Sequence, residues 1–408
     1  MCQHEPRRAE LAAVVRECAS AYRKQHGLSQ AEERVLRAIA ACRTEAMGGH
    51  VCVCDSCGAQ RYHYHSCRYR HCPKCQTRAK EQWLQRQRAQ LLPVPYFHVV
   101  FTLPHELNAL IRLNARALYG LLFDAAARTL HGFAANPRWL GGTLGVTLVL
   151  HTWSQTLMHH PHVHGLVSGG ALRASGQWQP AKPGFLFPVQ ALSRVFRGKY
   201  LEALNALRAD HQLRFPEDLA EPCQWNALIN TLRRQAWVVY LKPPLAGPEQ
   251  VLEYLARYTH RVALSNDRLV SVNATEVCLR YRDRAHGDAN KQMRLPATEF
   301  LRRFLLHALP PRFKRIRHYG LTANRSKAIH LAACRAALDA PAPPSLHVES
   351  AQSFLIRVTG RDHAACKAAW SCCSSCPDPH ACPICMPPDR RLHHDAPPPI
   401  RVPRPVVA

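Results

Sequence analysis

His159–Gly170 reads HHPHVHGLVSGG, and four of its first six residues are histidines. Successive side chains of a β-strand point to opposite faces, so a strand here places His162 and His164 on one face and Val163 on the other. Two imidazoles on one face can bind the same metal ion. The stretch therefore predicts a strand with one buried apolar face and a metal-binding pair on the other.

The residues before this stretch predict its partner strand. GVTLVLHTWSQTLMHHPHVHGLVSGGAL is typical of two strands joined by a turn, which we expect near His160 and Pro161. His151, Trp153 and Gln155 alternate along the first strand, so any one of them is a candidate third ligand. Two histidines and one oxygen ligand suit Mg2+ or Mn2+, which would act as a Lewis acid.

The charge of the chain indicates the class of its partner. Its 408 residues predict two or three domains, and 54 Lys and Arg face 28 Asp and Glu, a net charge of +26. Such an excess favours nucleic acid over a membrane surface or a generic basic protein. We find no run of the roughly 20 apolar residues that spans a bilayer and no signal peptide, so we expect no membrane partner and a cytoplasmic location.

Cysteines are unusually frequent, with 18 in the chain. Disulfides rarely persist in the cytosol, so clustered cysteines indicate metal binding. Two CxxC pairs separated by 14 residues have the spacing of a structural zinc site. The predicted zinc ligands are Cys54, Cys57, Cys72 and Cys75. Cys67 and His71, which lie between the two pairs, are candidates for a second or alternative metal site or are ordinary polar positions. A crowded C-terminal group is equally consistent with zinc binding and with none, and it comprises Cys373, Cys376, Cys382 and Cys385.

Two tyrosines stand four residues apart in VLEYLARYTHRV. Tyr254 and Tyr258 therefore share one helical face, and Arg257 and Arg261 repeat the spacing on a neighbouring face. Tyrosines in such a helix ordinarily pack into a core. Beside a divalent metal and arginines, however, a phenolate is an oxygen nucleophile that can attack a phosphodiester.

A basic run follows in the last third of the chain, without a single acid inside it. Either it contacts a nucleic-acid backbone or it is a solvated face, and we favour the first interpretation. Backbone contacts would make DNA affinity fall steeply with salt. The run comprises Arg312, Lys314, Arg315, Arg317, Arg325 and Lys327.

In combination, HPHVHGLVSGG and YLARYTHRVALSN resemble the HUH endonucleases, which are named for a histidine–hydrophobic–histidine motif. More narrowly, the chain resembles the rolling-circle transposases of the insertion sequence ninety-one family, because YHSCRYRHCPKCQ, FHVVFTLPHEL and RIRHYGLTANR also occur in that family's order. The resemblance implies an α+β fold: an HUH endonuclease domain with a central antiparallel sheet flanked by helices, preceded by a small helical and zinc-binding domain. We expect these in residues 93–335 and 1–92, followed by a Cys- and Pro-rich tail, 336–408, whose end is disordered.

The resemblance also implies an activity: metal-dependent nicking and rejoining of single-stranded DNA through a 5′-phosphotyrosine. It assigns Tyr254 and Tyr258 as nucleophiles, and His162, His164 and Gln155 as ligands of a catalytic Mg2+ or Mn2+. Cys54, Cys57, Cys72 and Cys75 match the family's structural zinc pattern. The expected partner is the single-stranded DNA of the element's ends, with no nucleotide cofactor, in the nucleoid of a bacterial cytoplasm.

Three other functions compete with this interpretation. A replication initiator or conjugative relaxase would use the same chemistry, but the zinc module and the block order disfavour it. A non-enzymatic, zinc-dependent DNA-binding protein would bind DNA without metal-dependent nicking. An acidic-triad transposase ranks last, because acids are scarce and no spacing singles out a set. The sequence leaves open which tyrosine attacks first and the oligomeric state.

Overall fold

A computed structural model describes residues 9–53, 60–242, 252–253, 256, 263–283, 287–343 and 349–360. These residues form two compact units, which are treated separately here. The first comprises the described residues up to Cys42 and those from Cys67 to His347, and the second comprises the described residues of Arg43–Ser66 and of the chain after Val348. The cysteine group and the histidine group described below both belong to the first unit.

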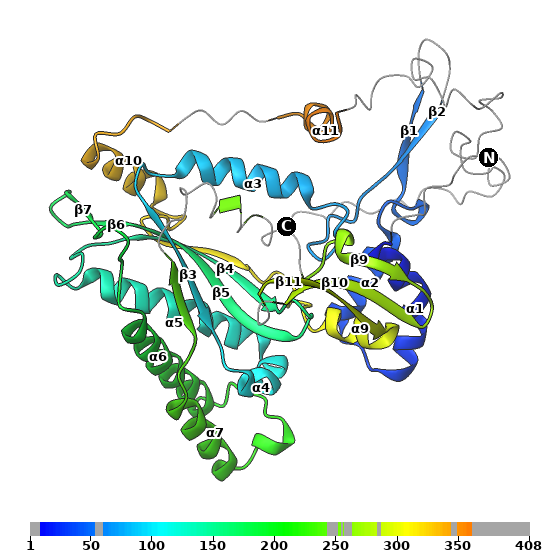
Figure 1. Cartoon of the computed structure of the whole chain (residues 1–408), viewed down its shortest axis with the longest axis horizontal. Helices are drawn as coiled ribbons and strands as arrows, with labels where there is room; N and C mark the ends of the chain where they lie inside the picture. The colour runs from blue at the N-terminus through cyan, green and yellow to red at the C-terminus, as the bar shows by residue number, and fades with distance from the viewer. Residues whose placement is uncertain are drawn as a thin grey trace, which may run out of the picture. The chain divides into compact units, whose positions relative to one another are not determined.

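The centre of the first unit is a five-stranded antiparallel sheet in the order β12-β4-β5-β3-β8 (Figure 1). The histidine strand β5 is the middle strand, and β4 and β5 form the hairpin that the sequence predicts. Both neighbours of β5 pair along most of its length, and its residues 161–168 are buried. The strands are β3 (Tyr96–Thr102), β4 (Gly145–Trp153), β5 (His159–Ser168), β8 (Val239–Lys242) and β12 (Ile316–Gly320).

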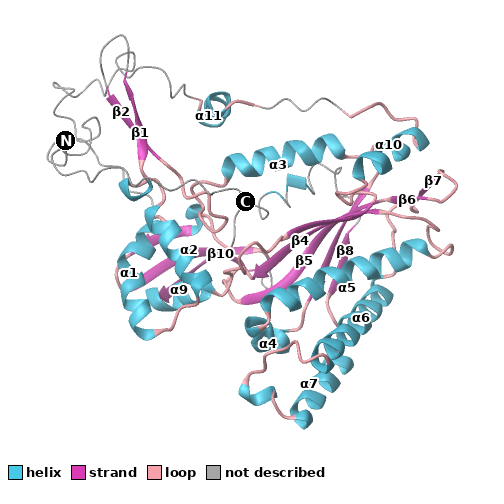
Figure 2. Ribbon diagram, turned by 180° about the vertical axis from the view of Figure 1, so that it is seen from behind, coloured by secondary structure: helices cyan, strands magenta, loops and turns pink. Residues whose placement is uncertain are grey.

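One face of this sheet is apolar and packs on helices. Val163 and Val167 of β5 lie in the main hydrophobic core with Phe97 and Phe101 of β3, so the predicted apolar face is confirmed. Figure 2 shows α5, α6 and α7 on this side of the sheet and α3 on the other. The helices are α4 (Asn108–Leu113), α5 (Ala115–Ala135), α6 (Val189–Ala209) and α7 (Pro222–Arg234) on the apolar side, and α3 (Thr77–Gln90) opposite.

A second core joins the N-terminal helices to a smaller sheet in the order β11-β10-β9. Helix α1 packs on α9, and the backbone N–H of Leu11 donates to Asn266 Oδ1 at 3.1 Å. This core cuts across the expected boundary at residue 92, because α1 and α2 bury their apolar faces against residues some 255 positions away. The elements are α1 (Leu11–Gln25), α2 (Gln30–Ala41), β9 (Leu269–Val272), β10 (Glu276–Asp283), β11 (Ala289–Pro296) and α9 (Ala297–Leu305).

The remaining described elements are short. In the first unit, β6 (Gly170–Leu172) pairs with β7 (Trp178–Pro180), and α10 (Lys327–Ala337) packs beside Leu92. The second unit contains the hairpin of β1 (Gly49–Val53) and β2 (Gln60–Tyr64) and helix α11 (Ala351–Thr359). None of the helices in the described ranges combines the length and the hydropathy that a bilayer crossing requires.

The turn of the histidine hairpin is not where the sequence predicts it. It spans Ser154 to Met158, and Pro161 lies inside β5 rather than in the turn. Proline has no N–H to donate to a partner strand. The register of β4 shifts between His151 and Trp153, opposite Pro161, and this bulge accommodates the missing donor.

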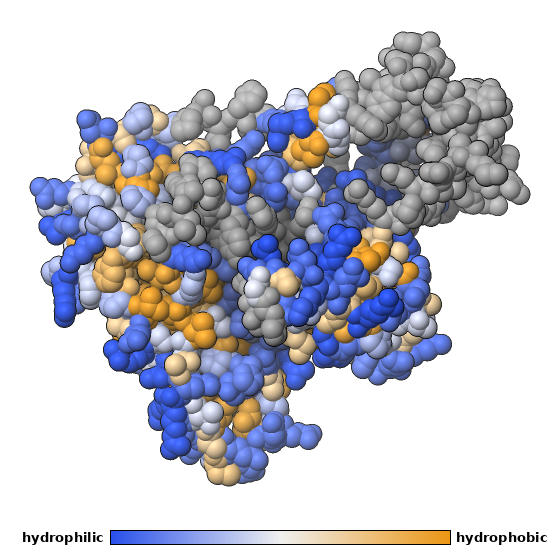
Figure 3. Space-filling model, in the orientation of Figure 1, coloured by the Kyte–Doolittle hydropathy of each residue, from blue (hydrophilic) through white to orange (hydrophobic). Residues whose placement is uncertain are grey.

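The surface of the molecule is mostly hydrophilic in the view of Figure 3, as the net charge predicts. A hydrophobic area lies over the β3 and β8 region of Figure 1. The edge strand β8 exposes Tyr240, and Val238 just before it is 63% exposed. An edge strand with apolar side chains is a surface at which other chains can pair.

Candidate functional site

Three histidines meet on the face of the central sheet opposite the apolar core. His151 of β4 lies directly across from His162 of β5, and His164 follows on the same face. Their ligand nitrogens all lie within 4.8 Å of one another, and His162 Nε2 is 3.1 Å from His164 Nε2. All three rings are at least nine-tenths buried, so the sheet fixes their positions.

This geometry fits a metal ion. Two nitrogens that each lie about 2.1 Å from one ion are separated by roughly 3.0–3.4 Å, which matches the pair in β5. Burial and the charge of the neighbouring His162 keep the pKa of His151 well below its ordinary value, so this imidazole is neutral, as a metal ligand must be. The group contains three imidazoles and no carboxylate.

A fourth imidazole orients the site from the next strand. His98 of β3 stacks on His164 with ring centroids 5.1 Å apart, and its Nε2 lies 2.9 Å from His164 Nδ1. Burial, together with the charge of Lys242, lowers the pKa of His98 to about 4, so His98 is neutral. If His164 Nδ1–H donates to His98, the Nε2 of His164 is left with its lone pair directed at the other two ligands.

The predicted third ligand, Gln155, lies in the turn beyond the end of β4. The backbone carbonyl oxygen of Gln155 accepts a hydrogen bond from the Arg268 guanidinium. His151, which the sequence offered as an alternative on the same strand, is the residue that the hairpin register brings to the histidine pair. His98 was not predicted, although the alternation of Tyr96, His98 and Val100 along the predicted strand is a signal that could have revealed it.

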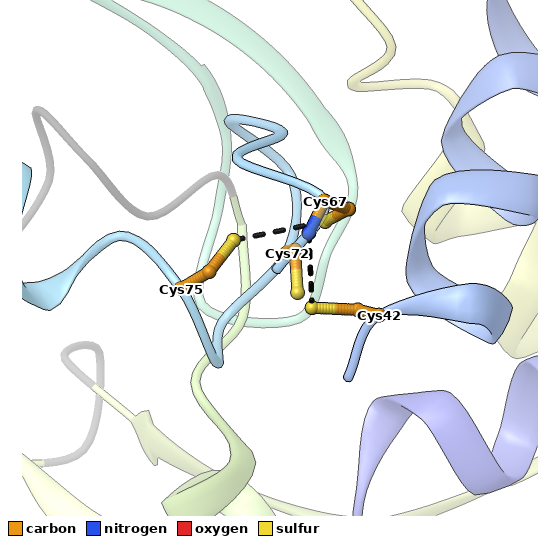
Figure 4. Close-up of side chains that lie close together, drawn as sticks. All are labelled: Cys42, Cys67, Cys72 and Cys75. Carbon is orange, nitrogen blue, oxygen red and sulfur yellow. Dashed lines mark hydrogen bonds between the residues drawn. The ribbon is translucent and has the colours of Figure 1, made fainter. Parts of the chain in front are cut away.

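Four cysteines form a second group of ligands. Cys42 ends α2, and Cys67, Cys72 and Cys75 come from the loop before α3; their sulfurs lie within 4.8 Å of one another (Figure 4). Cys67 Sγ is 3.6 Å from Cys75 Sγ, and the Cys67 N–H donates to Cys42 Sγ at 3.5 Å. Sulfurs bound to one tetrahedral zinc at about 2.3 Å lie roughly 3.8 Å apart, so the group fits zinc.

The cysteine group differs from the predicted set in its composition. Cys72 and Cys75 belong to it, together with the alternative candidate Cys67, whereas Cys54 and Cys57 lie outside the described residues. The Cys373, Cys376, Cys382 and Cys385 group is also outside them. Hydrogen bonds from the Cys67 and Cys72 thiols hold the pKa of Cys75 below its ordinary value, which favours the thiolate that zinc binds.

His71 lies within the cysteine loop but its ring is engaged elsewhere. Its Nε2 is 3.1 Å from the backbone oxygen of His307, and the side chain is almost fully buried. A carbonyl only accepts, so Nε2 carries the hydrogen. Cys42, which was not predicted, lacks a CxxC partner in the sequence and reaches the group through the packing of α2.

The predicted nucleophiles, Tyr254 and Tyr258, lie outside the described residues, as do Arg257 and Arg261. Residues beside them are described. Leu252 and Ala256 are buried against Val149 of β4 and Leu166 of β5, and Glu253 pairs with Arg88 of α3 at 2.7 Å. Val149 and Leu166 alternate with residues of the apolar core and therefore lie on the same sheet face as the three histidines.

Comparison with known proteins shows which family the chain belongs to. Residues 145–329 match the family model described as "Putative transposase", and residues 14–103 match the one described as "Transposase zinc-binding domain". "Putative transposase y4qJ" of Sinorhizobium fredii is 48% identical over 367 residues, which cover 88% of this chain and 92% of that protein. The chain belongs to the insertion sequence ninety-one family of transposases. This confirms the rolling-circle DNA transposase predicted from the sequence.

A second relative of this transposase is the "Transposase for insertion sequence element IS801" of Pseudomonas savastanoi pv. phaseolicola. It is 30% identical over 362 residues, which cover 86% of each chain. Among solved structures, a conjugative relaxase TrwC in complex with oriT DNA aligns with 13% identity and a TM-score of 0.22, covering 56% of the transposase and 83% of the relaxase in its metal-free form. Its metal-bound form aligns with the same identity and TM-score over 62% and 95%.

Some residues of the basic run of the transposase are exposed to solvent, whereas others contact neighbouring side chains or are buried. Arg312, Lys314 and Arg325 are exposed, whereas Lys327 is half-buried and donates to Gln90 Oε1 at 3.0 Å. Arg317 lies over the ring of Phe123, with its guanidinium carbon 4.4 Å from the centroid. Arg315 contradicts the prediction of a surface position, because it is only 8% exposed and burial lowers its pKa to about 9.

Proposed function

We propose that this transposase nicks and rejoins single-stranded DNA at the ends of its element, with Tyr254 or Tyr258 as the nucleophile. The tyrosine oxygen attacks a backbone phosphorus, the P–O3′ bond breaks, and the phenolic proton is lost. The products are a 5′-phosphotyrosine and a free 3′-OH. Attack by a 3′-OH on the phosphotyrosine reverses these steps, so the ester conserves the bond energy.

The observation that carries this proposal is the shared face of the central sheet. His151, His162 and His164 lie on it, and Leu252 and Ala256, which flank Tyr254 in sequence, are buried against the same face. Phosphodiester transfer requires a site for a divalent cation and an oxygen nucleophile. The three histidines and the two tyrosines would supply these groups, and the chain's membership of a transposase family supports their use in DNA strand transfer.

The chain's own residues have distinct tasks in this reaction. His151, His162 and His164 would hold a divalent cation, which supplies Lewis-acid polarisation of the scissile phosphate when bound. His98 keeps the tautomer of His164. Cys42, Cys67, Cys72 and Cys75 would bind a structural zinc.

The donor set also indicates which cation is preferred. Mg2+ favours oxygen ligands and keeps several waters, whereas imidazole suits first-row transition ions. We therefore propose His151 in place of Gln155 as the third ligand. Mn2+ and the later divalent ions of its row should support nicking at lower concentration than Mg2+.

A strand-cleavage assay tests the proposal. Labelled single-stranded DNA from the element's ends is incubated with protein and either Mn2+ or Mg2+, and covalent protein–DNA adducts are resolved by denaturing electrophoresis. We expect adducts from wild type that disappear with His162→Ala and with Tyr254→Phe, Tyr258→Phe or their double variant. His160→Ala is the matched control, because His160 is an exposed histidine of the same run. DNA binding without any adduct would instead indicate a zinc-dependent DNA-binding protein.

A further inference from the structure

The turn that joins the two metal-binding strands is held from outside the hairpin. Its three consecutive carbonyl oxygens, those of Gln155, Thr156 and Leu157, each accept a hydrogen bond from a side chain. The donors are Arg268, Arg303 Nη1 at 3.2 Å and His307 Nε2 at 3.1 Å, respectively. The donors lie in segments that contribute to the second core: Arg268 directly precedes β9, Arg303 belongs to α9, and His307 follows α9.

The turn requires such support because of its backbone. Leu157 has φ of 61°, a left-handed conformation that is rare for a leucine, and its side chain is fully buried in the second core. Residues in this region persist only where the surrounding structure fixes them. The hydrogen bonds to residues 155–157 and the burial of Leu157 supply that constraint.

His307 contacts both sides of the turn. Since the Leu157 oxygen can only accept, His307 Nε2 is the donor, and Nδ1 faces the Thr152 hydroxyl at 3.2 Å. Thr152 directly follows His151, so one ring links the ligand strand to the far end of the turn. The backbone oxygen of His307 in turn accepts from His71, which lies between Cys67 and Cys72.

Arg268 joins three segments through one guanidinium group. Its Nε donates to the Arg280 oxygen at 3.0 Å, Nη1 to the Ala263 oxygen at 3.2 Å, and Nη2 to Gln155. Ala263 follows Tyr258 by five residues in the sequence. A planar guanidinium with several fixed donors suits this role, and lysine cannot reproduce it.

We propose that Arg268, Arg303 and His307 are positioning residues that clamp the turn of the metal-binding hairpin and thereby set the affinity of His151, His162 and His164 for their cation. The proposal rests on the proposed function, since it assumes that the three histidines bind metal. The hydrogen bonds from these residues to the turn go to its backbone oxygens. They act by fixing the two strands whose spacing determines the ligand geometry.

Two neighbouring arginines allow a sharp test. Arg302 and Arg303 both pair with Glu299, with Nε–Oε distances of 2.6 Å, but only Arg303 has a hydrogen bond to the turn. Full-length, zinc-loaded protein is titrated with Mn2+, and free Mn2+ is measured by electron paramagnetic resonance. We expect Arg303→Met to raise the Kd for Mn2+ about tenfold and Arg302→Met to change it by no more than about twofold.

Further measurements separate the clamp from general damage. Arg268→Met removes a different contact of the same turn and should raise the Kd by a similar factor. Excess Mn2+ should restore nicking to Arg303→Met, since the tyrosines and ligands are intact. The clamp would be overturned if Arg303→Met and Arg268→Met both bound Mn2+ as tightly as wild type. It would also be overturned if Arg302→Met lost as much Mn2+ affinity as Arg303→Met.

The result also distinguishes the clamp from the proposed function. If wild type and His162→Ala bind Mn2+ equally, the three histidines are not the metal site, and the proposed function and the clamp both fail. If wild type binds Mn2+ through His162 while Arg303→Met and Arg268→Met bind it equally well, only the clamp fails.

Discussion

Replacing His98 with leucine should weaken metal binding without removing a ligand. The substitution deletes a 2.9 Å hydrogen bond to His164 and a stacked ring contact. A hydrogen bond of this kind contributes about 1 kcal/mol, and a stacked pair about 0.5–1 kcal/mol. Their loss would also free His164 to rotate or to adopt the other tautomer. The combined loss of about 2 kcal/mol corresponds to a roughly 30-fold higher Kd for the cation.

Mn2+ titration of zinc-loaded protein, followed by electron paramagnetic resonance, measures this change, and thermal unfolding of the same samples reports on the fold. His318→Leu is the matched control. His318 is, like His98, a partly buried histidine of the central sheet, and its Nδ1 lies 2.9 Å from the Thr147 hydroxyl, away from the cluster. We expect the control to leave the Kd within about twofold of wild type.

Two results would refute this reasoning. Wild-type Mn2+ affinity in His98→Leu would show that the imidazole does not orient His164. An equal loss of affinity in His318→Leu would show that any cavity in the sheet disturbs the site. His98→Gln adds a further check, because an amide can accept the same hydrogen bond and should recover part of the affinity.

Three further predictions concern the cysteines, pH and DNA. Cys42→Ser should reduce the zinc bound by the purified protein, measured by atomic emission, whereas Cys334→Ser, a buried cysteine outside the group, should not; equal zinc in both would exclude Cys42 as a ligand. Burial lowers the pKa of His307 to about 3, so this ring is neutral in the native state but takes up a proton below about pH 6.5 when unfolded. The contribution of His307 to the free energy of unfolding is therefore complete above pH 6.5 and is lost as pH falls towards 3, with about 2 kcal/mol lost between pH 7.5 and 5. In urea unfolding, His307→Gln should lose about 2 kcal/mol less stability than wild type over this pH range. An equal loss in both proteins would contradict the prediction. Arg325→Ala should reduce the slope of log affinity for DNA against log salt by about 1, while Arg37→Ala, an exposed arginine of α2, should leave the slope unchanged.

The local pattern of the sequence was sufficient for the histidine strand. Alternation predicted that His162 and His164 share a face and that Val163 lies in a core, and both features depend only on the two-residue period of a strand. The third ligand could not be predicted in this way. Its identity depends on where β4 ends, which is decided by the bulge opposite Pro161 rather than by any property of Gln155.

Long-range packing explains the other differences. His98 reaches the site only because β3 pairs with β5 in one particular register. Cys42 joins the cysteines because α2 packs in the second core. Arg315 is basic like its neighbours, but β12 begins beside it and buries it against the sheet, where the Leu150 N–H donates to its backbone oxygen. Strand alternation places His98 on one face of β3, but neither this pattern nor any local pattern around Cys42 or Arg315 shows which other elements these residues meet.

One core connects the two groups of metal ligands. Cys42 and Cys72 are buried in the same cluster as Trp153 and Leu157, which belong to the hairpin that carries the histidines. A zinc bound by the cysteines would therefore order a wall of the core into which the turn of the metal hairpin packs. The N-terminal helices and the cysteine loop therefore share a core with the histidine hairpin, although they lie on opposite sides of residue 92 in the sequence. The apolar surface that α2 and the cysteine loop bury is, in part, the surface that holds the histidine hairpin in place.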